Sequence, residues 1–89
     1  MAPIEEKMQF AYFVVTQLPL APRRKTHAYL IHSRSSGLLL GRIDWFGSWR
    51  QYCFWPEPGT LWSDGCLADV QAVLSRLQPK RRVRVSAAG

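Results

Sequence analysis

Residues 44–55 constrain the fold more than any other stretch of the chain. Six of these twelve residues are aromatic, and a Gly-Ser pair lies in the middle. A two-residue loop with glycine first is typical of a type II′ hairpin turn, because glycine adopts the positive φ that this turn requires. Gly47-Ser48 therefore predicts the turn of a β-hairpin, and the cross-strand pairs follow by counting outward. Phe46 would then face Trp49.

Side chains alternate along the two strands of such a hairpin, so its two faces can be separated in the sequence. One face is apolar, and we assign it to the core beneath a helix. Its members are Leu39, Gly41, Ile43, Trp45, Arg50, Tyr52 and Phe54. In this register Gly41 lies opposite Phe54, whose ring would lie across the glycine. Arg50 lies opposite Trp45 and would make a cation–π contact with it.

The second face mixes charges with three large aromatic side chains. Its members are Leu40, Arg42, Asp44, Phe46, Trp49, Gln51, Cys53 and Trp55. Exposed rings flanked by arginine are typical of sheets that stack the bases of single-stranded nucleic acid. Tryptophan and arginine also dominate protein interfaces, and a loop or a second copy of the chain would bury the same rings as ordinary packing. The sequence leaves these three interpretations open.

A patch of this kind is unusual on the surface of a lone protein, so we expect something to cover it. A partner, a nucleic acid or a homodimer would each do so. The predicted binding residues are Arg42, Phe46, Trp49, Gln51 and Trp55, together with the basic run Arg23, Arg24 and Lys25.

The remaining pattern predicts further strands at 9–18 and 25–33, in addition to the hairpin strands at 38–46 and 49–56. A helix is predicted from about 64 to 78, with Ser63 or Asp64 as its N-cap. Apolar residues recur along it at helical spacing, namely Leu67, Val70, Val73, Leu74 and Leu77. The expected fold is α+β, a four-stranded antiparallel meander with one C-terminal helix packed on one face.

A single domain spanning residues 1–89 is expected, with a folded core at about 9–78. Residues 79–89 are strongly basic and are expected to form either a tail or a short edge strand.

The chain carries a net charge of +6, from twelve Lys and Arg against six Asp and Glu. This balance favours polyanionic partners such as nucleic acid or an acidic protein. Nothing resembles a signal peptide, and the apolar clusters are too short to span a membrane. We therefore expect a cytoplasmic protein with no membrane partner.

Catalytic chemistry has few candidates in this sequence. Cys66 falls in the first turn of the predicted helix, where backbone N–H groups would favour a thiolate. Its only available bases are His27 and His32, which lie five residues apart on opposite faces of one strand. The two cysteines, Cys53 and Cys66, lie on separate elements, unlike the closely paired cysteines of a zinc knuckle. We expect no enzyme, no metal and no cofactor, with a cysteine-based enzyme or redox protein as the remaining chemical alternative.

The segment from Leu40 to Pro56, continuing to Asp69, resembles a group of small proteins from phages, prophages and other mobile elements. They share a Gly-x-Ile-x-Trp-aromatic-Gly-x-Trp-Arg-x-Tyr-x-Phe-x-Pro pattern, and the resemblance covers roughly residues 25–77. This resemblance implies no catalytic activity and no catalytic residues. It implies a setting in which small proteins bind and redirect host machinery, including defence complexes that handle nucleic acid.

The expected function is therefore that of a small non-enzymatic protein that binds host protein or nucleoprotein machinery through the second face. The alternative is a direct binder of single-stranded DNA or RNA.

Overall fold

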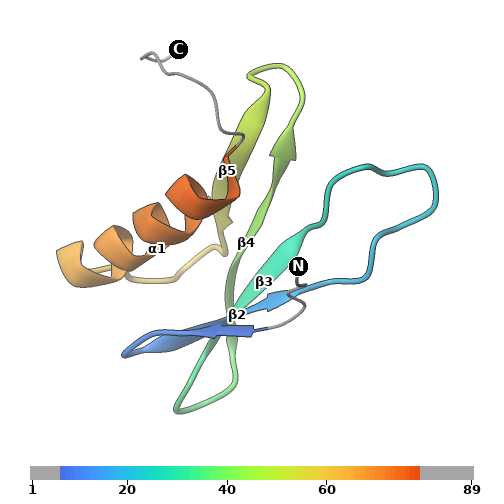
Figure 1. Ribbon diagram of the computed structural model, residues 1–89. Coiled ribbons are helices and arrows are strands. Elements are labelled where there is room, and N and C mark those ends of the chain that lie inside the picture. Colours follow the sequence, from blue (N-terminus) through green and yellow to red (C-terminus); the bar gives the residue numbers. More distant parts are fainter. Residues whose placement is uncertain (1–6, 79–89) are drawn as a thin grey trace.

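The computed structural model describes residues 7–78, which form one antiparallel sheet and one helix in an α+β arrangement. Five strands lie in the sheet in chain order, and the helix lies along one side of β4 and β5 (Figure 1). The elements are β1 Lys7–Gln9, β2 Phe13–Gln17, β3 Tyr29–Ser33, β4 Leu39–Phe46, β5 Gln51–Pro56 and α1 Asp64–Leu77.

The sheet has five strands rather than four, because the segment predicted as one strand at 9–18 is divided by a tight turn. The Phe10 N–H donates to the Phe13 carbonyl oxygen at 2.9 Å. The turn folds β1 back onto β2, so that Met8 and Phe10 join Phe13 and Val15 at the core. The predicted tail or edge strand at 79–89 lies outside the described residues.

The β4–β5 hairpin turns through four residues, 47–50, and the predicted two-residue turn is wrong. Phe46 pairs with Gln51, and the only left-handed residue of the loop is Arg50, with φ of 51°. This register sets Trp45 opposite Tyr52, and their rings meet edge to face with centroids 5.3 Å apart. The two-residue turn would instead have placed Arg50 there, so aromatic packing favours the longer loop.

The register differs from the prediction by two residues, and an even shift leaves each strand side chain on its predicted face. The exceptions come from a β-bulge, at which Ile31 pairs with Gly41 but His32 pairs with Leu39. The extra residue, Leu40, packs against the core, whereas Leu39 is 40% exposed. The predicted faces of these two leucines are therefore exchanged.

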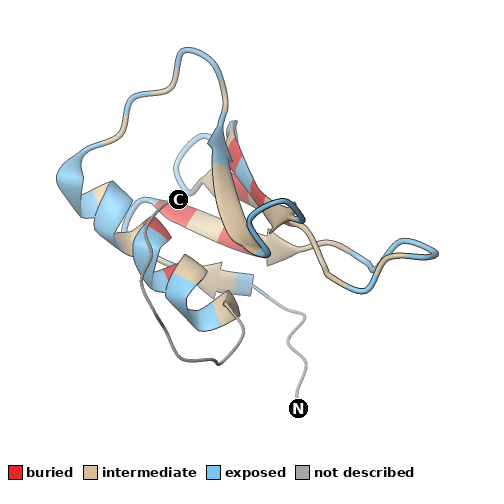
Figure 2. Ribbon diagram, turned by 90° about the horizontal axis from the view of Figure 1, so that it is seen from above, coloured by how far each residue is buried: buried red, intermediate tan, exposed pale blue. Residues whose placement is uncertain are grey.

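The core lies between the sheet and α1. Its buried side chains, which Figure 2 shows on the strands and on one side of the helix, are Phe13, Val15, Tyr29, Ile31, Ile43, Val70 and Val73. Ser63 is the N-cap, as one of the two predicted caps, and its Oγ accepts a hydrogen bond from the Cys66 N–H at 3.1 Å. Leu67, predicted on the apolar side of the helix, is 48% exposed. Over residues 7–78 no helix has both the length and the hydropathy needed to cross a membrane.

Candidate binding surface

No helix or strand of residues 7–78 covers the sheet face opposite α1 (Figure 1), and the β2–β3 loop reaches this face at Asp44. We call this surface the open face. Strands β4 and β5 contribute one half of it, namely Arg42, Asp44, Phe46, Gln51, Cys53 and Trp55. Strands β1 to β3 contribute the other half, namely Lys7, Gln9, Val14, Thr16, Leu30 and His32. All twelve residues are partly or largely exposed, in contrast to the buried residues beneath α1.

Four side chains form a continuous group on this face, which we call the aromatic cluster: Arg42, Phe46, Trp49 and Trp55. The Arg42 guanidinium carbon lies 5.5 Å from the centre of the Trp55 ring. The Phe46 ring is nearly perpendicular to both indoles, at 6.2 Å from Trp55 and 5.1 Å from Trp49. Trp49 belongs to the 47–50 loop and not to a strand, but its ring still reaches the predicted face.

The cation–π contact predicted between Arg50 and Trp45 is wrong. The register places Arg42 directly opposite Trp55 instead of Cys53, so this pair makes the contact. Arg50 lies in the loop and is exposed, away from the core face to which it was assigned.

One row of side chains crosses the whole open face from edge to edge. Successive cross-strand partners in this row are Lys7, Thr16, Leu30, Arg42 and Trp55. Neighbouring strands lie about 4.8 Å apart, so the backbone positions of Lys7 and Arg42, three strands from each other, are about 14 Å apart. Between them lie the hydroxyl side chain of Thr16 and the aliphatic side chain of Leu30. Sequence reasoning missed the β1–β3 half of the face, although the alternation at 13–17 and 29–33 contains it.

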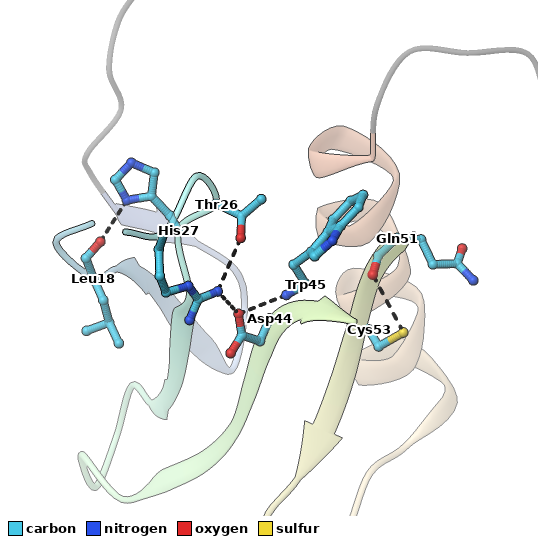
Figure 3. Close-up of polar contacts among 8 residues, drawn as sticks. Leu18, Thr26, His27, Asp44, Trp45, Gln51 and Cys53 are labelled. Carbon is cyan, nitrogen blue, oxygen red and sulfur yellow. Dashed lines mark hydrogen bonds and ion pairs between the residues drawn. The ribbon is translucent and has the colours of Figure 1, made fainter. Parts of the chain in front are cut away.

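Asp44 is held at the edge of the aromatic cluster by two donors. Its Oδ1 accepts from Arg24 Nη2 at 2.7 Å and from the Trp45 N–H at 2.8 Å (Figure 3). Burial alone would raise the pKa of this carboxyl group. The two hydrogen bonds, with the charges of Arg24 and Arg42, outweigh burial and hold the pKa below its ordinary value.

The same ion pair fixes the β2–β3 loop, residues 18–28, against the sheet. Arg24 Nη2 also donates to Thr26 Oγ1 at 3.2 Å. At the base of the loop, His27 Nδ1 lies 2.8 Å from the Leu18 carbonyl oxygen (Figure 3). Residues 25–28 thus belong to the loop, and β3 begins at Tyr29 and not at residue 25 as predicted.

The predicted basic run is divided by this arrangement. Arg24 is half-buried in its ion pair, whereas Arg23 and Lys25 are exposed on the β2–β3 loop. In an antiparallel meander the β2–β3 and β4–β5 connections lie at the same end of the sheet. Arg23 and Lys25 therefore lie at the same end as Trp49 and Arg50.

The two remaining predicted residues of the hairpin lie beside one another on β5. Gln51 faces Phe46, and the Cys53 thiol points to the Gln51 carbonyl oxygen with Sγ at 3.9 Å (Figure 3). Burial raises the pKa of the Cys53 thiol, which disfavours the thiolate that a nucleophile requires.

Cys66, the candidate nucleophile, lies in the first turn of α1 and packs against the core, whereas His32 lies on the open face. The sheet lies between Cys66 and His32, so His32 is not placed to act as a base for Cys66. Within residues 7–78 no group of three or more His, Cys, Asp and Glu is placed to hold a metal ion.

Comparison with known protein families, with curated proteins and with solved structures gives no match to this chain. The geometry of the open face and the chemistry of its side chains are therefore the basis for a functional assignment.

Proposed function

We propose that this chain is a small non-enzymatic binding protein whose open face docks on another protein. The observation that supports this most is the aromatic cluster on an uncovered sheet face. Trp49 is 58% exposed and Trp55 is 38% exposed, although both are large apolar side chains. Interfaces take most of their binding energy from a few tryptophan, tyrosine and arginine residues of this kind.

The composition of the whole face supports a protein partner. The aromatic rings occupy the β4–β5 half, and the centre of the sheet carries Val14 and Leu30. An aliphatic centre beside aromatic anchors suits the side chains of a packed protein element. The resemblance to proteins of mobile elements supports the same proposal, with host protein or nucleoprotein machinery as the partner.

The test is affinity capture from a lysate of the native host, with and without nuclease. The set of captured proteins should survive nuclease and should be lost with Trp55→Ala. The matched control is Leu67→Ala, which removes an exposed leucine from α1, outside the open face. Equal losses with both variants, or no loss with Trp55→Ala, would reject the open face as the docking surface.

Direct binding of single-stranded nucleic acid is the second candidate, favoured by the exposed indole of Trp49. Arg50 follows Trp49 in the loop, and Arg23 and Lys25 lie at the same end of the sheet. Such binding should weaken steeply with salt, by roughly one power of the salt concentration for each phosphate contact. Fluorescence anisotropy with a single-stranded oligonucleotide measures this slope. Capture that disappears after nuclease treatment would favour this candidate over the first.

A further inference from the structure

We propose that the partner presents an acidic segment to the open face, with its carboxylates bound by Arg42 at the centre and Arg50 at the rim. This inference rests on the proposed function, since it names the chemistry of the partner that the open face takes. The observations behind it are the distribution of charge over the fold and the backbone conformation of Arg50.

Charge is distributed unequally over the two sides of the sheet. Residues 7–78 contain eight Lys and Arg but four Asp and Glu. Three of these acids, Glu57, Asp64 and Asp69, lie after β5, in the connection to α1 or on α1 itself. The fourth, Asp44, lies on the open face and is already bonded to Arg24. Within residues 7–78 neither Lys7, Arg42 nor Arg50 makes an ion pair with a carboxylate.

Arg42 is positioned to bind an incoming carboxylate. It is exposed and is held over the Trp55 ring, 5.5 Å from its centre, which limits the freedom of its side chain. A guanidinium in a fixed orientation binds a carboxylate through two parallel hydrogen bonds. The same partner could then pack apolar side chains on Trp55 and Leu30, the two cross-strand neighbours of Arg42.

The backbone conformation of Arg50 also supports the proposal. Its φ of 51° is in the left-handed region that glycine and asparagine favour, and a larger residue there is strained. Its side chain is exposed and makes no hydrogen bond or ion pair with residues 7–78. The Arg50 N–H donates to the Gly47 carbonyl oxygen at 3.2 Å and closes the loop, whereas the strained residue's charged side chain is left free. A strained backbone that presents an unused charge is typical of residues kept for binding. Arg50 follows Trp49 directly, so its charge lies at the rim of the aromatic cluster.

A second copy of the chain is a poorer occupant of this face. A two-fold interface through the open face would bring the same surface of two molecules together, including Lys7 and Arg42 of each. Like charges would then meet in a desolvated interface. A stacked nucleic acid is also a poorer occupant, because one side of the Trp55 ring is covered by Arg42 and Phe46 meets both indoles edge to face.

The test is selection from a random peptide library displayed on phage, with the intact protein as bait. Selected peptides should carry Asp or Glu next to aromatic or aliphatic residues and should lose binding to Trp55→Ala. Arg42→Gln should weaken them about tenfold or more, as expected for the loss of a charged hydrogen-bonding partner. The control is Arg76→Gln, which removes an exposed arginine from α1 and should change nothing.

The substitution Arg50→Gly distinguishes a role of Arg50 in binding from a role in forming the 47–50 turn. The substitution relieves the left-handed strain, so unfolding should require more urea, while binding of the acidic peptides should weaken severalfold. Arg50→Lys keeps both the charge and the strain and should bind more tightly than Arg50→Gly. If Arg50→Gly is more stable and binds unchanged, the rim role of Arg50 is wrong.

The outcomes distinguish this inference from the function on which it rests. The acidic partner alone would be overturned by peptides that need Trp55 but bind the Arg42→Gln variant as well as the wild type. It would also be overturned if the peptides still bind after their own Asp and Glu residues are replaced by Asn and Gln. A single-stranded oligonucleotide that binds more tightly and needs Trp55, or self-association that needs Trp55, would overturn it too. Failure to select any peptide that needs Trp55 would contradict the proposed function itself.

Discussion

At the scale of single residues, Gly41 shows how closely β4 and β5 are packed. A Cβ at this position would lie 2.7 Å from Phe54 Cε1 and 2.9 Å from the Trp55 carbonyl oxygen. The Phe54 ring thus lies over the glycine from a diagonal position, although Pro56 is the direct cross-strand partner. Any side chain at Gly41 must displace the strand that carries Trp55.

We expect Gly41→Ala to lower the free energy of unfolding by about 1–3 kcal/mol, because overpacking a filled site forces the backbone to move. Urea unfolding measures the change. Gly47→Ala is the matched control, since an added Cβ there meets no atom within 4 Å. Its effect should stay within about 0.5 kcal/mol. Equal effects of the two substitutions would contradict the packing described for Gly41.

Asp44 makes the free energy of unfolding depend on pH in the acidic range. Because its pKa is lower in the folded chain than in the unfolded chain, its ionised form adds stability above about pH 4, the unfolded value. That contribution is lost as the pH falls from there through the lowered folded pKa. Asp44→Asn and Arg24→Gln should each flatten the fall of the urea midpoint below about pH 4. Acid profiles that match the wild type in both variants would contradict this account.

At the scale of elements, the end of α1 protects the outer edge of β5. The Gln78 side chain accepts from the Tyr52 N–H at 2.8 Å and donates to the Tyr52 carbonyl oxygen at 3.0 Å. One amide therefore makes the two bonds that a further strand would make. Pro56, at the end of the same strand, has no N–H to offer.

Gln78→Ala should therefore expose the backbone of Tyr52. We expect faster hydrogen exchange of the Tyr52 amide by NMR, and a loss of about 1–2 kcal/mol for two net hydrogen bonds. Gln71→Ala, on the exposed side of α1, is the control and should leave this exchange rate unchanged. An unchanged Tyr52 exchange rate in Gln78→Ala would show that the edge is protected by something else.

The elements also show how far the sequence predicts this fold. The helix and its Ser63 cap were predictable because capping and helical spacing are local signals. The turn of β4–β5 was not, because Gly-Ser favours a short loop locally whereas the packing of Trp45 on Tyr52 across the strands favours a longer one. The open face survived this error because the register changed by two residues. The bulge at Leu40 and the pair Arg24–Asp44 depend on contacts between distant segments, which the pattern does not contain.

At the scale of the whole molecule, the described fold has two layers, one sheet and one helix, whereas a sheet covered on both faces would make three layers. One helix packs on one side of the five-stranded sheet, and the seven buried side chains of residues 7–78 all lie on that side or on the helix. The opposite side retains the aromatic cluster, which includes Arg42, and the charge of Lys7. We propose that this side is exposed in the isolated protein and is covered on binding.

Hydroxyl-radical footprinting of the isolated protein, with its solution mass measured in parallel, measures whether Trp49 and Trp55 are open to solvent. We expect a monomer of 10.2 kDa in which Trp49 and Trp55 are oxidised readily and the buried Phe13 is protected. A monomer in which both tryptophans are as protected as Phe13, or a dimer that protects them, would contradict this proposal.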